Sequence, residues 1–279
     1  MQNVAMTTAP NHNRPNPKEN LMTSQLKQNL RFLTLAATLF LAFASLPTHA
    51  EFVLIDDFEA YADGDSISSK ADWNNNGTVD TDPADGTNLV LSFSPSNGIG
   101  YYGGSDIKIA DNTTGTLLYR ARLTSGGQAF GMGMSDETAP NPWDSFEAQL
   151  TWDETGSPIS VRDGSGPHPE ATTTDDAWYN VWMVIDNTND EYDVYLQSDD
   201  DANFSSQTQI ADDAGFRNGS ANNDLVSFFM RTNAGTGSVL YIDDIKLDNT
   251  GKNLAIPEPA SLTLFILGGL ALTRRRQRG

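Results

Sequence analysis

Residues 178–197, WYNVWMVIDNTNDEYDVYLQ, carry the strongest secondary-structure signal in the chain. Apolar side chains recur at every second position on both sides of a polar break, which is the period of a β-strand with one buried face. The break, residues 187–190, predicts a four-residue hairpin loop between two antiparallel strands. The positions that share a face are Tyr179, Val181, Met183 and Ile185 in the first strand, and Tyr192, Val194 and Leu196 in the second.

The same pattern of short β-rich runs continues through residues 51–250, and no stretch shows a sustained helical period. Clusters of Gly, Asn, Asp and Ser separate the runs, and Asn-Gly pairs supply the positive φ that tight turns need. About twelve strands at this spacing predict an all-β fold, an antiparallel β-sandwich. The predicted strands cover residues 52–58, 88–94, 106–110, 116–123, 128–134, 145–152, 158–162, 178–186, 191–197, 207–211, 225–231 and 238–248.

The protein is strongly acidic, and its charge is unevenly distributed. The 279 residues contain 17 Lys and Arg against 37 Asp and Glu, and residues 51–256 alone hold nine basic and 35 acidic residues. This balance argues against nucleic-acid binding, because phosphate affinity comes from clustered Lys and Arg. The absence of cysteine excludes disulfides and thiol catalysis, and three histidines are too few for a His-rich metal site.

The first fifty residues are typical of an export signal. Lys27 and Arg31 precede thirteen uncharged, apolar-rich residues at 32–44, a length that suits a signal peptide and is short for a membrane span. Small residues follow, which predicts cleavage after Ala50 by signal peptidase. The residues before Met22 are polar and unlike a signal, so Met22 is the predicted true start. The alternative is an N-terminal membrane anchor.

The C-terminus holds a second hydrophobic segment. Fourteen uncharged residues at 260–273 would span about 21 Å as a helix, short of a hydrocarbon core of about 30 Å. The arginines that follow would keep this end in the cytoplasm and the body outside. The flanking residues are Pro257, Glu258 and Pro259 before the segment, and Arg274, Arg275 and Arg276 after it.

This order of a Pro-Glu-Pro element, a Gly-containing apolar run and an arginine cluster resembles the PEP-CTERM sorting signal of exported bacterial proteins. The resemblance implies processing by an exosortase-type membrane protease in a species that makes exopolysaccharide. It implies a protein of the cell envelope, outer surface or extracellular matrix, transiently anchored in the inner membrane by the C-terminal helix. The predicted divisions are a signal peptide at 1–50, a β-sandwich at 51–248, a polar linker at 249–256 and the sorting tail at 257–279.

Three motifs of the body carry a second resemblance. They are IDDFEAY at 55–61, WYNVW at 178–182 followed by YDVYL at 192–196, and YIDDI at 241–245. Together they resemble concanavalin A-like jelly rolls of the laminin-G type. The galactose-binding-like jelly rolls share the opening and closing motifs and are the second choice.

Acidic residues near the first and last predicted strands suggest a cation site. In both jelly-roll families these strands are often neighbours, and a structural calcium often lies near their ends. The hypothesis is that Asp57, Glu59 and Asp243 or Asp244 bind Ca²⁺, which prefers six to eight oxygen ligands. Asp243 is expected on the same strand face as Ile245, where an unpaired carboxylate would be costly. The alternative is that one Asp of each pair is solvated and the other caps backbone amides.

Catalytic signatures are weak. Glycosidases need two carboxylates that face each other across the substrate. The closest match to the acidic strand of concanavalin A-like glucanases is Glu191-x-Asp193, in which Tyr195 takes the third acidic place. His168 is the only histidine of the body and lies in the predicted rigid loop 166–169, without a nucleophile pattern. The sequence therefore predicts a non-catalytic protein.

Exposed aromatic residues would favour sugar binding. Trp143 lies in the proline-rich stretch 139–144, and Tyr101 and Tyr102 lie between glycines. Rings in such loops can stack on sugars, although Trp143 could instead close one end of the core. The predicted function is an exported surface or matrix protein that binds extracellular polysaccharide. The alternatives are a structural or adhesive protein without a ligand, and a glycoside hydrolase.

Overall fold

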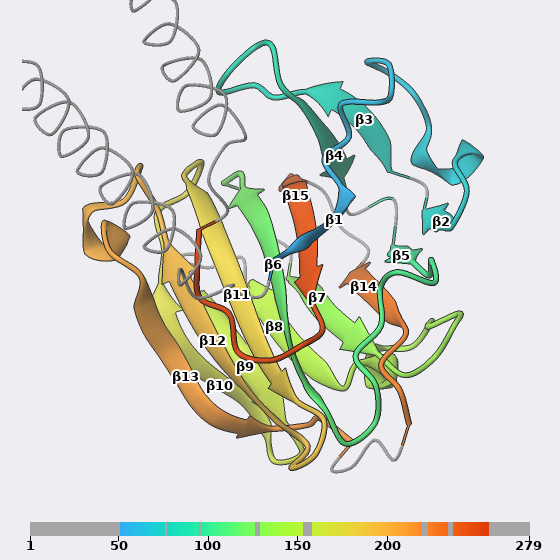
Figure 1. The fold of residues 1–279 in the computed structure, drawn as a ribbon. Helices are drawn as coiled ribbons and strands as arrows, with labels where there is room; N and C mark the ends of the chain where they lie inside the picture. Colours follow the sequence, from blue (N-terminus) through green and yellow to red (C-terminus); the bar gives the residue numbers. More distant parts are fainter. Residues whose placement is uncertain are drawn as a thin grey trace, which may run out of the picture. The chain divides into compact units, whose positions relative to one another are not determined.

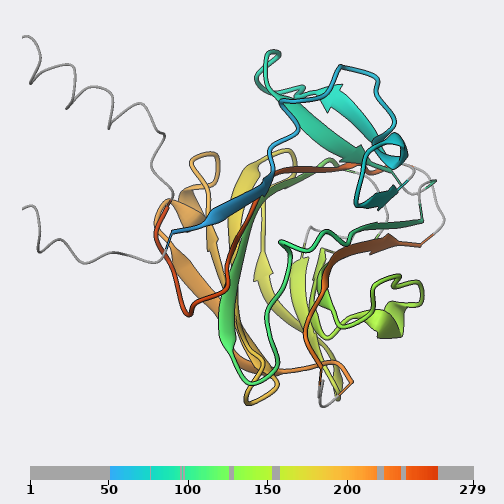
Figure 2. The same ribbon diagram turned by 45° about the vertical axis from the view of Figure 1, so that its right-hand side comes forward.

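The computed structural model describes residues 51–256, apart from 76, 95, 97, 126–128, 153–157, 219–222 and 234–236. In this part of the chain two antiparallel β-sheets pack face to face (Figures 1 and 2), which confirms the predicted all-β sandwich. No helix among these residues is both long and apolar enough to cross a membrane. The predictions for export, cleavage after Ala50 and the sorting tail 257–279 concern residues outside the described ones.

An eight-stranded sheet forms one layer. Its hydrogen-bonded order is β13-β12-β11-β6-β15-β4-β3, and β1 pairs with β15 off this path. The strands are β13 (Thr208–Gly215), β12 (Glu191–Gln197), β11 (Trp178–Asp186), β6 (Thr114–Leu123), β15 (Leu240–Asp248), β4 (Leu89–Phe93), β3 (Thr78–Thr81) and β1 (Val53–Asp56).

A seven-stranded sheet forms the other layer, in the order β10-β9-β8-β7-β14-β5-β2. Short 3₁₀ helices lie at Ile67–Ser69, Trp143–Ser145 and Ala202–Phe204. The strands are β10 (Gly166–Thr172), β9 (Pro158–Asp163), β8 (Ala148–Trp152), β7 (Phe130–Ser135), β14 (Ser227–Thr232), β5 (Ile99–Tyr102) and β2 (Trp73–Asn75).

The predicted hairpin occupies the middle of the eight-stranded sheet. The bounds of β11 and β12 agree with the predicted strands, and Ile185 pairs with Tyr192 next to the loop. All seven side chains predicted to share a face lie in the main hydrophobic core. The hairpin then pairs with β6 on one side and β13 on the other, so its buried face sets the register of the layer.

The core between the sheets is built from alternate residues of both layers. Met132 and Met134 of β7 and Leu150 of β8 face inward from the seven-stranded sheet, while Gly131 and Gly133 face outward. Trp152 is fully buried, and its ring lies edge-on to Tyr179 of the opposite layer with the ring centroids 5.5 Å apart. On the outward face of the seven-stranded sheet, Phe229 of β14 packs on Phe146 with the ring centroids 4.2 Å apart.

Several strands differ from the prediction. Residues 166–169, predicted as a rigid loop, begin the edge strand β10, where a proline is tolerated because one side of the strand needs no donor. Strands β2, β3 and β5 were not predicted. Residues 106–110 form no strand, and Ile109 makes an isolated bridge to Leu225. Strands β2, β3 and β5 are at most four residues long, too short to show a period.

The segment predicted as a polar linker runs along the outer face of the eight-stranded sheet. The Thr116 hydroxyl donates to the Gly251 carbonyl at 2.8 Å and accepts from the Asn253 amide at 2.9 Å. Leu254 and Phe52 pack against a second hydrophobic cluster on this face, made of Leu118, Trp182, Val184 and Tyr195. Both ends of the described chain therefore lie on the outer face of the eight-stranded sheet.

Candidate functional site

The residues predicted to bind calcium do not form one site. Asp243 is 2% exposed, and its Oδ2 accepts a hydrogen bond from Asn88 at 2.9 Å and lies 3.4 Å from Arg120. The Asp244 carboxylate binds Lys246 at 2.7 Å, and the Glu59 carboxylate accepts from the Leu89 amide.

Asp57 of the same set only accepts from the Glu59 amide, at 3.2 Å. Asp243 does not share a face with Ile245, because a β-bulge at Asp244, with φ of +53°, reverses the alternation. Asp243 therefore points outward to Arg120, which supplies its counter-charge. No three of these four residues bring carboxylate oxygens within 4.8 Å of one another in the described part of the chain.

A different acidic group forms at the β12 to β13 edge. Among the described residues, only Asp193, Asp212 and Asp213 bring three possible ligand atoms within 4.8 Å of one another. Lys252 already lies 3.0 Å from the Asp193 carboxylate. Glu191, Asp193 and Tyr195, the closest match to a glucanase strand, are thus partly engaged by the C-terminal segment. This group is an ion-paired surface cluster.

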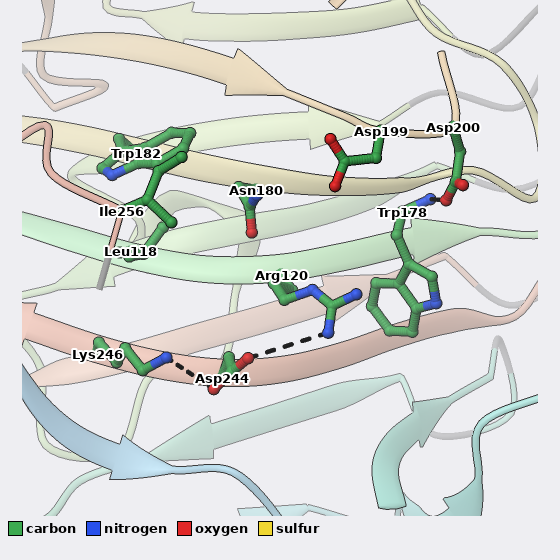
Figure 3. A pocket seen from close by; sticks show the side chains of 10 residues that line it. All are labelled: Leu118, Arg120, Trp178, Asn180, Trp182, Asp199, Asp200, Asp244, Lys246 and Ile256. Carbon is green, nitrogen blue, oxygen red and sulfur yellow. Dashed lines mark hydrogen bonds and ion pairs between the residues drawn. The ribbon is translucent and has the colours of Figure 1, made fainter. Parts of the chain in front are cut away.

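A hollow of about 480 Å³ lies on the outer face of the eight-stranded sheet (Figure 3). Its charged groups largely satisfy one another: Arg120 lies over the Trp178 ring at 4.9 Å, and Asp244 lies between Arg120 and Lys246. Trp178 is 7% exposed and Trp182 is fully buried. The hollow therefore offers no open ring face and few free charges to a ligand.

The outer face of the seven-stranded sheet is different. The strand register places Arg162 of β9 beside Gln149 of β8, and Gln149 beside Gly133 of β7. In the next row Gly131 of β7 lies beside Arg231 of β14. Gly131 and Gly133 have no side chains, so a side chain from a neighbouring loop can lie directly on the sheet at this point.

Trp143 is the residue whose side chain lies over this part of the sheet. It begins the 3₁₀ helix Trp143–Ser145, and its ring lies so close over Gly131 that an added Cβ there would be 2.6 Å from Cζ3. Its Nε1 donates to the Asn233 side chain at 3.1 Å, and the Arg231 guanidinium lies 5.7 Å from the ring. Trp143 is half-buried and belongs to neither hydrophobic core cluster. Its ring packs on the buried Phe146, with the ring centroids 6.1 Å apart.

The two predicted tyrosines separate. Tyr101 of β5 is half-buried on the same outer face, and its hydroxyl accepts from Asn74 at 2.8 Å. Tyr102 points the opposite way, is 7% exposed and packs against Trp73 with the ring centroids 5.2 Å apart. The expectation of an exposed ring is wrong for Tyr102, because adjacent residues of a strand face opposite sides.

Three arginines gather beside Trp143. Arg217 donates to the Gln149 side chain at 2.7 Å and to the Trp143 carbonyl. Burial lowers the pKa of Arg217, and the charges of Arg162 and Arg231 lower it further. We call the surface formed by Trp143, Glu147, Arg162, Arg217 and Arg231 the arginine face.

Within the described part of the chain, several buried polar atoms of the arginine face have no hydrogen-bond partner. They are Nε of Arg162, Nε and Nη1 of Arg231, and Oε2 of Glu147. Among the described residues, the arginine ion pairs are made by Arg120 and Arg122 on the opposite sheet. Buried polar groups are nearly always paired in folded proteins, and unpaired ones often mark a site for water, an ion or a ligand.

The sequence pattern singles out Trp143 but not the three arginines. Arg162 and Arg231 lie within or at the end of predicted strands, far apart in the sequence, and Arg217 lies beyond a strand. Only nine basic residues occur in 51–256, and three of them meet here. Their scarcity is the one signal that could have singled them out, but the pairing of strands that unites them could not be read from the sequence.

Glu147 gives the arginine face a pH dependence. Burial raises its pKa to about 7, although a hydrogen bond from Asn218 opposes the rise. Unfolded, a glutamate titrates near 4.5, so the folded protein holds more protons between pH 4.5 and 7. The stability that Glu147 contributes is therefore fully present below pH 4.5 and lost as the pH rises to 7. We expect a loss on the order of 2–3 kcal/mol.

Thermal unfolding between pH 5 and 8 tests this expectation with Glu147→Gln. Asp243, whose pKa burial raises to about 6, accounts for part of the slope below pH 6. The decline in melting temperature between pH 6 and 7 should therefore flatten in the variant, and the variant should be the more stable protein at pH 8. An unchanged slope in this interval would show that Glu147 titrates normally.

Comparisons with known proteins add structural likeness only. No family model matches the sequence, and no curated protein matches it. Lectin II from Ulex europaeus is similar in structure at a TM-score of 0.48 and 10% identity, over 72% of this chain and 99% of that one. The catalytic domain of a glycoside hydrolase family 131 protein from Coprinopsis cinerea is similar at a TM-score of 0.45 and 11% sequence identity. The match covers 75% of this chain and 98% of that domain. A sialidase is similar at a TM-score of 0.48 and 13% sequence identity. The match covers 72% of this chain but only 19% of the sialidase.

Proposed function

We propose that the protein is an exported, non-catalytic glycan-binding protein and that the arginine face is its binding site. The observation that carries the proposal is the half-buried Trp143 ring among buried guanidinium atoms that lack partners. Sugars are bound by aromatic surface combined with a few fixed polar groups. The unpaired donors would receive their acceptors from sugar oxygens, which removes the cost of leaving them unpaired.

The arrangement supports binding better than hydrolysis. A glycosidase needs two carboxylates about 5–9.5 Å apart on either side of the scissile bond. The arginine face presents mainly donors, and its buried acid, Glu147, has one oxygen engaged by Asn218 at 3.0 Å. We therefore assign no catalytic residue.

Attachment to the cell surface is the second part of the proposal. It rests on the sequence, on the resemblance of 257–279 to a sorting tail. Ile256 and Phe52 lie on the outer face of the eight-stranded sheet, opposite the arginine face. A chain held through its C-terminus would thus keep the arginine face directed toward the matrix.

Trp143→Ala tests the proposed site. The purified full chain in mild detergent is applied to an array of neutral and acidic oligosaccharides, and positive sugars are titrated by calorimetry. We expect the variant to lose about tenfold or more in affinity, about 1.4 kcal/mol, since it loses the apolar surface that the ring would bury against the sugar at about 25 cal/mol per Å². Lys246→Ala, on the opposite outer face, should bind as the unmodified protein does. Absence of binding by the unmodified protein, or equal binding by Trp143→Ala, would refute the proposal.

A further inference from the structure

The arginine face concentrates positive charge on a protein that is otherwise acidic. Arg217 donates to the side chain of Gln149, which pairs with Arg162 in the strand register, and to the carbonyl of Trp143, whose ring lies beneath Arg231. Arg162 and Arg231 each lower the pKa of Arg217, which agrees with their placement on either side of it. Asp144 and Glu147 are near enough to oppose that effect. Neither acid forms an ion pair with any of the three arginines among the described residues, where such pairs belong to Arg120 and Arg122. Three guanidinium groups thus face two nearby carboxylates, which leaves the face with a net positive charge.

The unpaired guanidinium atoms indicate which chemical group a ligand of the arginine face should carry. Nε of Arg162 and both Nε and Nη1 of Arg231 are buried without a hydrogen-bond acceptor among the residues that the structure describes. A neutral hydroxyl could accept from these donors but would leave the buried charge uncompensated, which is costly. A carboxylate supplies acceptors and charge together, and its planar shape matches the guanidinium fork.

The remaining groups suit a sugar that carries such a carboxylate. The Arg231 guanidinium lies over the half-buried Trp143 ring, 5.7 Å from its centroid, and Gln149 links Arg162 to Arg217 through its side chain and its place in the register. Glu147, 4% exposed, adds an unpaired acceptor that can receive a sugar hydroxyl. The arginine face thus combines apolar surface, positively charged hydrogen-bond donors and one hydrogen-bond acceptor.

From this arrangement we infer that the arginine face binds glycans through a carboxylate, as in chains of uronic acids, with Arg162 and Arg231 as the groups that receive it. The inference rests on the proposed function and narrows its ligand class. Binding should weaken as salt is added, because part of the attraction is between charges near the surface. Neutral glycans of the same backbone should bind more weakly.

Oligouronates and their methyl esters provide the matched probes. Tetramers of mannuronate, guluronate, glucuronate and galacturonate, and the fully methyl-esterified form of each, are titrated calorimetrically into the full chain in mild detergent at pH 7.5. Esterification removes the charge and retains the sugar. We expect at least one acid to bind about tenfold or more tightly than its ester, the difference of about one charged hydrogen bond.

Variants locate the binding. Arg231→Ala and Arg162→Ala should each lose tenfold or more in affinity for the acid and little in affinity for the ester. Arg231→Lys should recover only part of the affinity for the acid. Arg120→Ala, on the opposite outer face, should bind as the unmodified protein does. Circular dichroism and melting temperature establish that each variant is folded.

The outcomes separate the inference from the function on which it rests. Equal binding of acid and ester, or preference for a sulfated or neutral oligosaccharide over every uronate, would overturn the carboxylate inference and leave glycan binding in place. Binding of the acid that is unaffected in both arginine variants would overturn the assignment of these residues. Failure of every uronate and every sugar on the array would overturn the inference and the proposed function together.

Discussion

Gly133→Ala should give a protein that is severely destabilised or does not fold. Gly133 has φ of +153°, and a Cβ built on it would lie 1.9 Å from the Ala148 carbonyl oxygen in the neighbouring strand β8. The obstacle is backbone inside a paired layer, since Gly133 pairs with Gln149 and Met134 with Ala148. Relief requires β7 and β8 to separate, and we expect a loss of about 3 kcal/mol or more.

Gly131→Ala is the matched control for this prediction. Its added Cβ would meet Cζ3 of Trp143 at 2.6 Å, an atom at the far end of a side chain that can turn away. It should cost less stability than Gly133→Ala while displacing the Trp143 ring. Urea unfolding followed by far-UV circular dichroism measures both. An unfolding midpoint for Gly133→Ala equal to that of the unmodified protein would contradict the described packing of β7 on β8.

Trp152→Ala should cost about 3–5 kcal/mol of unfolding free energy. Trp152 is fully buried between the sheets, its Nε1 donates to the Thr173 hydroxyl at 2.8 Å, and its ring packs edge-on to Tyr179. Truncation removes a large apolar contact from both layers at once and removes the hydrogen bond between the Trp152 indole and the Thr173 hydroxyl.

Trp152→Phe separates the two contributions to that loss. It keeps a ring in the core and removes only part of the volume and the hydrogen bond, so its loss should be clearly smaller. Both variants are measured by urea unfolding at pH 7.5. Near-equal stability of Trp152→Ala and the unmodified protein would contradict the placement of Trp152 at the centre of the sandwich.

The sequence predicted the layers well where strands are long and alternate clearly. The hairpin of β11 and β12 was predicted to the residue because seven apolar side chains alternate on either side of a polar loop. Short edge elements were missed for a physical reason. Three or four residues cannot show a period, and the prolines of β10 argue against a strand unless its edge position is known.

The site could be predicted only in part. Trp143 and Tyr101 stood out as aromatic residues in loop-like sequence, and both lie on the outer face of the seven-stranded sheet. Asp243 was misplaced because the bulge at Asp244 changes the facing of every following residue, and an Asp-Asp pair gives no sign of it. Arg162, Arg217 and Arg231 come together through strand pairing between distant segments, so their cluster is a property of the fold.

The five tryptophans allow a direct test of where a glycan binds. Each indole N–H has its own hydrogen-bond partner, so each should give a distinct resonance in an amide correlation spectrum. The five pairs are Trp73 with Asp56, Trp143 with Asn233, Trp152 with Thr173, Trp178 with Asp82, and Trp182 with the Ala255 carbonyl. Single Trp→Phe variants assign the resonances.

A bound oligosaccharide identified on the array is titrated into the ¹⁵N-labelled full chain while the five indole resonances are followed. If the arginine face is the binding site, the Trp143 resonance shifts in a saturable way and the Trp178 and Trp182 resonances stay in place. A saturable shift of Trp178 and Trp182 with Trp143 unmoved would contradict it and place the ligand in the hollow on the opposite sheet.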